Sequence, residues 1–96
     1  MADKTRAQIL AELHAKYGGS AAAFARALGV PAQWYYRHQN QARLDSGEEV
    51  GPKNCRQPGH GLIQCARYAL RVREVEATLA RTQAALLEAL GQAPAA

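Results

Sequence analysis

The stretch from residue 62 to residue 91 constrains the fold more than any other part of the chain. Up to residue 90 it contains neither proline nor glycine, and it consists mostly of good helix formers. Two sets of side chains recur in it every seven residues, the first at Cys65, Val72, Leu79 and Leu86, the second at Tyr68, Val75, Thr82 and Ala89. This heptad pattern is typical of a coiled-coil seam, and the helix would be about 43 Å long. We therefore expect a long amphipathic helix that joins two chains. Packing back onto its own chain is the alternative.

Composition gives a second reason to expect association. Hydrophobic residues make up 48% of the 96, but 21 residues are alanine, which favours helix and buries little area. These counts predict an all-α fold with a thin core, and association stabilises such a chain. No apolar run is long enough to cross a membrane, and no signal-peptide pattern begins the chain. With only two cysteines present, we expect a cytoplasmic protein with free thiols.

Glycine and proline divide the first half of the chain into short segments. Helices are predicted over residues 4–17, 21–28 and 31–41, because glycines lie between them. Residues 42–61 lose the helical period and contain four glycines and two prolines. We expect a helical head over 1–45, a loop over 46–61 and a frayed tail over 92–96. Part of the loop should be ordered or functional, since long structureless loops are unusual in compact domains.

The segment Ser20–Asn40 has the spacing of a helix-turn-helix. Ala25 is small at the position where two helices would cross closely, and Gly29 suits the positive backbone angle of a sharp turn. Apolar side chains stand where they would fill the angle between the helices and tie the pair to the first helix, at Phe24, Leu28, Val30 and Tyr35.

Over about residues 4–44 the chain resembles the Cro and phage-repressor type of helix-turn-helix protein. The resemblance lies in a glycine-glycine break, the run F-A-R-A-L-G-V at 24–30 and the helix that follows. It implies a DNA-binding head whose third helix is the recognition helix, and regulation by occluding a promoter. Charge agrees with this reading, because residues 20–44 contain three arginines and no acidic residue.

Residues expected to contact DNA lie on the recognition helix and beside it. The amides of Gln33 and Asn40 could read adenine, and Arg37 could read guanine. Ala32 could touch a thymine methyl group. The full expected set is Ser20, Arg26, Ala32, Gln33, Tyr36, Arg37, Asn40 and Arg43. For each polar member, a phosphate contact or plain solvation is the alternative to base reading.

Two further aromatic residues of this helix are expected to point away from DNA. Tyr35 should point inward, with His38 beside it. Trp34 should lie in the core, and an exposed position that serves a partner is the alternative.

Cys55, His60 and Cys65 have the one spacing that suggests a metal site. The gaps between them are wider than those of ordinary structural zinc sites, and a fourth ligand would have to come from afar. Small core side chains or a disulfide are the alternatives, so no metal and no cofactor are expected. No spacing typical of a nucleophilic triad, a phosphate-binding glycine loop or a carboxylate pair occurs, so we do not expect an enzyme.

The preferred reading is a sequence-specific regulator of transcription, a repressor that binds double-stranded DNA as a homodimer. The expected dimer interface is Cys65, Tyr68, Val72, Val75, Leu79 and Leu86. In a parallel pair Arg71 would face Glu76 of the second copy. No small-molecule effector is evident. The alternatives are a protein-binding adaptor or inhibitor of a mobile element, and an accessory protein of DNA packaging or recombination.

Overall fold

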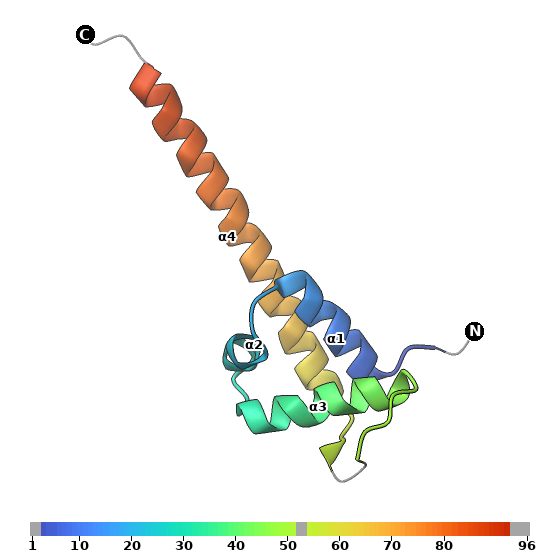
Figure 1. Ribbon diagram of the computed structural model, residues 1–96. Helices are drawn as coiled ribbons and strands as arrows, with labels where there is room; N and C mark the ends of the chain where they lie inside the picture. The colour runs from blue at the N-terminus through green and yellow to red at the C-terminus, as the bar shows by residue number, and fades with distance from the viewer. Residues whose placement is uncertain (1–2, 52–53, 93–96) are drawn as a thin grey trace.

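The computed structural model describes residues 3–51 and 54–92, and over these residues all regular structure is α-helical (Figure 1). The helices are α1 (Arg6–Tyr17), α2 (Ala21–Leu28), α3 (Ala32–Asp45) and α4 (His60–Gln92). The expected all-α fold class and the long last helix are confirmed.

Helix boundaries differ from expectation at five places. α1 begins at Arg6 rather than at residue 4, and α3 begins at Ala32 rather than at residue 31. α3 continues four residues beyond residue 41, because Ala42 is buried one turn after His38 on the face that begins at Tyr35. α4 begins at His60 rather than at residue 62, so the loop covers 46–59. Gln92, expected in the frayed tail, is still helical, and 93–96 lie outside the described residues.

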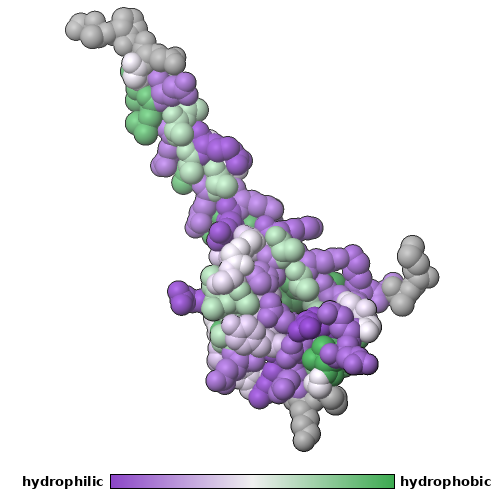
Figure 2. All heavy atoms as spheres, viewed as in Figure 1, coloured by the Kyte–Doolittle hydropathy of each residue, from purple (hydrophilic) through white to green (hydrophobic). Residues whose placement is uncertain are grey.

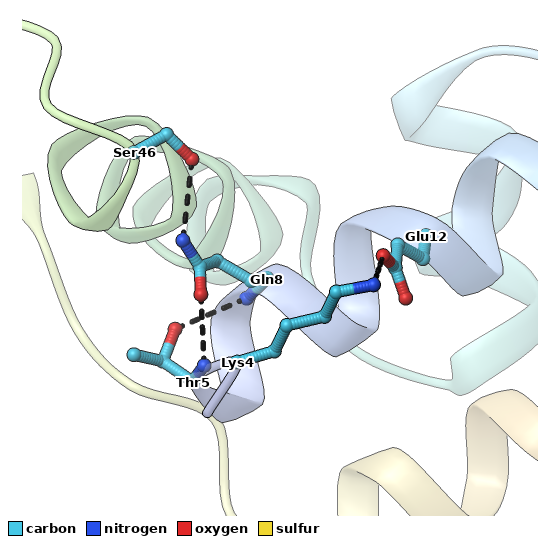
Figure 3. Close-up of polar contacts among 5 residues, drawn as sticks. All are labelled: Lys4, Thr5, Gln8, Glu12 and Ser46. Carbon is cyan, nitrogen blue, oxygen red and sulfur yellow. Dashed lines mark hydrogen bonds and ion pairs between the residues drawn. The ribbon is translucent and has the colours of Figure 1, made fainter. Parts of the chain in front are cut away.

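The start of α1 is fixed by a capping box. Thr5 Oγ1 accepts the backbone N–H of Gln8, and the Gln8 side chain accepts the backbone N–H of Thr5, so both groups are satisfied reciprocally (Figure 3). Gln8 Nε2 also donates to Ser46 just past α3, and Lys4 pairs with Glu12 along α1 (Figure 3).

Aromatic side chains join the first three helices. The ring of Phe24 in α2 stacks on His14 at 4.8 Å and meets Tyr35 edge to face at 5.5 Å. His14 Nε2 lies 3.1 Å from the carbonyl oxygen of Gly19, which can only accept, so this nitrogen carries the proton. The Tyr35 hydroxyl therefore donates to His14 Nδ1, 2.8 Å away. Burial raises the pKa of Tyr35, which keeps this hydroxyl protonated. The expected inward position of Tyr35 is confirmed.

The first turns of α4 complete the head. Ile63 and Ala66 are 4% and 0% exposed and belong to the same core cluster as Leu10, Phe24 and Tyr35. From Arg71 to Gly91 every side-chain position of α4 is exposed, and this part leaves the head as a single rod (Figure 1). The 33 residues of α4 correspond to about 50 Å. The alternative, packing of this helix on its own chain, thus holds for its base only, and the expectation that the helix joins two chains stays a prediction.

The carboxylate of Asp45 connects the loop to the start of α1 and to the end of α3. Asp45, at the end of α3, accepts hydrogen bonds from Thr5 Oγ1 at 2.5 Å, Gln41 Nε2 at 2.9 Å and Gln57 Nε2 at 2.7 Å. Gln57 Oε1 also accepts the backbone N–H of Ala7 at 3.0 Å. The loop is therefore held against the start of α1 and the end of α3.

Two glycine substitutions should change stability in opposite directions. Gly29→Ala should lower the free energy of unfolding by about 1–2 kcal/mol, because Gly29 has φ 73°, a left-handed angle that disfavours a Cβ. Gly61→Ala should raise it by about 0.5–1 kcal/mol, because Gly61 lies in α4 with open space where the Cβ would stand. Urea unfolding measures both. A loss at Gly61 equal to that at Gly29 would contradict the assigned start of α4.

Asp45→Ala should lower the free energy of unfolding by about 1–2 kcal/mol at pH 7, because three donors lose a charged acceptor that is partly exposed. Burial raises the pKa of Asp45, but the hydrogen bonds from Thr5, Gln41 and Gln57 outweigh it and hold the pKa below its ordinary value. The folded state thus binds this proton less tightly than the unfolded state. The stabilisation is complete above about pH 4 and disappears as the pH falls through the folded-state pKa.

Thermal unfolding between pH 2 and pH 7 measures the difference in the free energy of unfolding between the unsubstituted protein and Asp45→Ala. Glu49→Ala is the matched control, since Glu49 is an exposed acidic residue nearby, and its effect should stay within about 0.5 kcal/mol. If the stability difference between the unsubstituted protein and Asp45→Ala did not shrink in acid, the charge of Asp45 would not be what stabilises the fold.

Candidate nucleic-acid interface

The turn between α2 and α3 fixes how α3 crosses α2. Gly29 takes a left-handed conformation, and its N–H donates to the carbonyl of Arg26 at 3.1 Å. The N–H of Val30 donates to Ala25 at 3.0 Å, which closes the end of α2. Figure 1 views α2 nearly along its axis while α3 runs across the picture, so the two helices cross steeply. Steep crossing through a short glycine turn is the geometry of a helix-turn-helix.

The outward side of α3 presents part of the expected set. Gln33, Tyr36 and Arg37 are exposed, and they share the side of α3 opposite to Tyr35 and Ala42. Ala32 is half-buried at the first position of the helix. Three long polar or aromatic side chains therefore form one surface that a flat or grooved partner can reach.

Asn40 also lies on this side of α3, but its side chain is half-buried and its amide already makes a hydrogen bond within the protein. Its Nδ2 donates to the carbonyl of Asn54 in the loop at 3.2 Å. The Nδ2 group has a second hydrogen and the amide oxygen is uncommitted in this contact, but the side chain is oriented by the loop rather than by a partner.

The expectation that Trp34 lies in the core is wrong. Its ring is 41% exposed, and the loop that returns along α3 supplies a second cation beside it. The guanidinium carbons of Arg37 and Arg56 lie 4.9 Å and 5.0 Å from the ring centroid. We call Trp34, Arg37 and Arg56 the Arg–Trp–Arg cluster. Two cations on one indole ring give a surface that combines positive charge with an aromatic face.

The loop is fastened to α3 beside this cluster. The backbone N–H of Arg56 donates to the carbonyl of Arg37 at 3.2 Å, and His38 Nδ1 donates to the carbonyl of Arg56 at 2.7 Å. The prediction omitted Arg56, which lies 19 positions after Arg37 in a segment without helical period. The single available signal was that a loop of this length should be partly ordered.

The remaining expected DNA contacts lie near α2 and at the end of α3. Ser20 caps α2, since its Oγ accepts the N–H of Ala23 at 3.1 Å, and its hydroxyl hydrogen stays available to an acceptor such as phosphate. Arg26 is exposed in the last turn of α2. Arg43 is exposed and pairs with Glu48 at 3.5 Å, which offsets part of its charge.

The expected seam residues all lie on the surface of α4. Cys65 is exposed, and the larger members Tyr68, Val72, Val75, Leu79 and Leu86 are 55–65% exposed. Hydrophobic side chains run along the projecting rod among polar ones (Figure 2). The prediction omitted Leu90, which is 62% exposed, although its size was a signal, because position 90 falls outside the two heptad positions used.

Nothing in the part of the chain that the structure describes gathers three His, Cys, Asp or Glu side chains at one point, and both cysteines are free. Among the helices over residues 3–51 and 54–92, none is long and apolar enough to cross a membrane. Neither profiles of known protein families, nor curated proteins, nor solved structures give a match to this chain.

Quenching of Trp34 fluorescence should report the two cations beside it. Trp34 is the single tryptophan, so its emission is that of the cluster. Iodide should quench it less in Arg56→Ala than in the unsubstituted protein, because one attracting charge is lost, whereas neutral acrylamide should quench it at least as well. Arg81→Ala, on the exposed rod, is the control and should change neither slope. Equal iodide slopes in all three proteins would contradict the position of Arg56.

Proposed function

We propose that this protein is a sequence-specific regulator of transcription, a repressor that binds double-stranded DNA as a homodimer. The observation that carries the proposal is the outward surface of α3, a helix that crosses α2 through a glycine turn. This surface presents Gln33, Tyr36 and the Arg–Trp–Arg cluster, to which the loop contributes Arg56. A helix of this kind can enter the major groove, and amide and guanidinium side chains can read base edges there.

Each group has a chemical role in this proposal. Arg37 has the planar pair of donors that matches the acceptors of guanine, and stacking on Trp34 restricts its orientation. Arg56, the second cation beside the Trp34 ring, would contact a phosphate of the DNA backbone. Ser20 and Arg26 on α2 would hold the sugar-phosphate backbone, which sets register rather than sequence. A positive surface also attracts DNA at long range.

A dimer is part of the proposal because one short recognition helix offers few contacts. A two-fold dimer presents two recognition helices to half-sites about 34 Å apart, one turn of DNA. A palindrome is the matching sequence. Repression then requires only that the bound protein cover a promoter.

A protein-binding adaptor is the second candidate. It is favoured by the exposure of two large aromatic side chains on the same surface, Trp34 at 41% and Tyr36 at 47%. Exposed aromatic residues are common at the centre of protein interfaces. Salt separates the two candidates, since DNA binding weakens steeply with salt and a mainly apolar interface does not.

Arg37 provides the sharpest test of the proposed function. After selection of bound sites from random DNA, Arg37→Ala should weaken binding to the selected site by about 1–3 kcal/mol and relax preference at one base pair per half-site. Arg37→Lys keeps the charge but loses the bidentate fork, so it should lose specificity and retain most binding to random DNA.

Arg26→Ala serves as the phosphate-contact comparison. It should weaken binding to selected and random DNA alike and lower the salt slope by about one. Arg81→Ala, on the rod far along α4, should change neither the DNA affinity nor its salt dependence. If Arg37→Ala and Arg26→Ala both bind every DNA like the unsubstituted protein, the head is not a DNA reader and the adaptor becomes the better candidate.

A further inference from the structure

The rod of α4 carries a row of large apolar side chains that remain exposed in the structure of residues 3–51 and 54–92. We call it the α4 stripe and define it as Tyr68, Val72, Val75, Leu79, Leu86 and Leu90, each 55–65% exposed. At about 100° per residue the six side chains fall within a band about 60° wide along roughly 33 Å of helix. Single apolar side chains are ordinary on protein surfaces, whereas a contiguous row indicates an interaction site.

The stripe and the head use different sides of α4. Residues that pack on the head, including Ile63, Ala66 and Leu70, are centred about 145° round the helix from the stripe. At the base of the stripe, Tyr68 and Val72 line an open groove of ≈ 420 Å³ together with Tyr17 and Leu28. A partner helix that lies along the stripe therefore meets the head of the chain it binds at this groove only, beside Tyr17 and Leu28, and contacts the rod alone beyond it.

We propose that the α4 stripe pairs with the same stripe of a second copy, parallel and in register. The inference rests on the homodimer of the proposed function but not on DNA. Charge selects the orientation, because Arg71 and Glu76 flank the stripe on opposite edges. In a parallel pair opposite edges meet, so Arg71 faces Glu76 of the second copy five positions along, twice per dimer. In an antiparallel pair like edges meet, and Arg71 faces no glutamate.

The spacing of the largest residues also specifies the shape of the contact. Tyr68, Leu79 and Leu90 are eleven residues apart, which is three turns at about 3.67 residues per turn. That value is close to the 3.6 of a straight helix, so the two rods lie almost straight against each other. This register brings Leu90 into the interface, where a strict heptad places the smaller Ala89. Both heads then lie at one end of the pair, on its outer sides.

Disulfide trapping distinguishes the orientations. In a chain with Cys55→Ser and Cys65→Ser, Leu86→Cys should form a covalent dimer under mild oxidation, because the two residues 86 face each other in the parallel pair. In an antiparallel pair centred on Leu79, the two copies of residue 86 would be about 21 Å apart along the helices and unlinked. Ala77→Cys, on the far side of the rod, is the matched control and should stay monomeric on a denaturing gel.

Charge exchange tests the same arrangement without cysteine. Arg71→Glu should raise the dimer dissociation constant about tenfold, because two attractions become repulsions, and Arg71→Glu with Glu76→Arg should restore it. Leu79→Asp should raise it by about 100-fold or more and give monomers in light scattering. Both substitutions lie on the rod outside the head, so urea unfolding of the head, followed by the fluorescence of Trp34, should be unchanged.

The outcomes separate this inference from the proposed function. A dimer whose Leu86→Cys chains stay unlinked overturns the parallel orientation, and a monomeric mass for the unsubstituted protein overturns the pairing. Trapping at residue 86 together with no binding to any DNA supports the pairing and overturns the proposed function alone. Specific DNA binding by a monomer overturns the pairing and the homodimer of the proposed function, and it supports the DNA-binding role of the head.

Discussion

The head is closed by the base of a helix that mostly lies outside it. Few large apolar residues are available from α1, α2 and α3, and the core they form with Phe24 and Tyr35 is completed by Ile63 and Ala66. Because these two residues must face inward, the rotation of α4 about its own axis is fixed within the head. The direction and the facing of the whole rod follow from that contact, since an unbroken helix transmits its rotation along its length.

The outward surface of α3 is built by two segments, because the loop adds Arg56 to the side chains of the helix. Asp45 and Gln57 hold the loop at the far end of α3, and the backbone of Arg56 pairs with Arg37 and His38. The second cation on Trp34 is thus supplied by a segment with no regular structure of its own. Hydrogen bonds and the full burial of Pro58 therefore hold this loop in place together.

Local rules predicted a large part of this arrangement. Gly29 was expected at the turn because a positive φ is needed there, and Tyr35 was expected inside because of its helical spacing to other apolar positions. Trp34 was misplaced, because its ring lies partly exposed beside Arg56 of the loop rather than in the core, and no rule that works over one helix can detect a contact with a distant loop. Asn40 was correctly expected near the outer side, but its bond to Asn54 depends on the same loop. The end of α3 was missed since its last buried position is Ala42, whose small side chain gives little periodic signal.

The rod has a consequence for how the protein responds to its own abundance. Beyond Leu70 no described side chain of α4 is buried, although the Arg73 guanidinium lies over the Tyr17 ring at 4.2 Å. In a single chain the helix of this segment therefore depends mainly on alanine content and on its attachment to an ordered first turn. A helix held only by such terms lies near the balance between helix and coil, and covering one of its sides shifts that balance. Helix formation in the rod is then coupled to the binding of a partner on its exposed side. In the proposed dimer the fraction of fully helical rods rises with protein concentration as pairs form, and the cost of ordering the rod makes the pair weaker than one between two preformed helices.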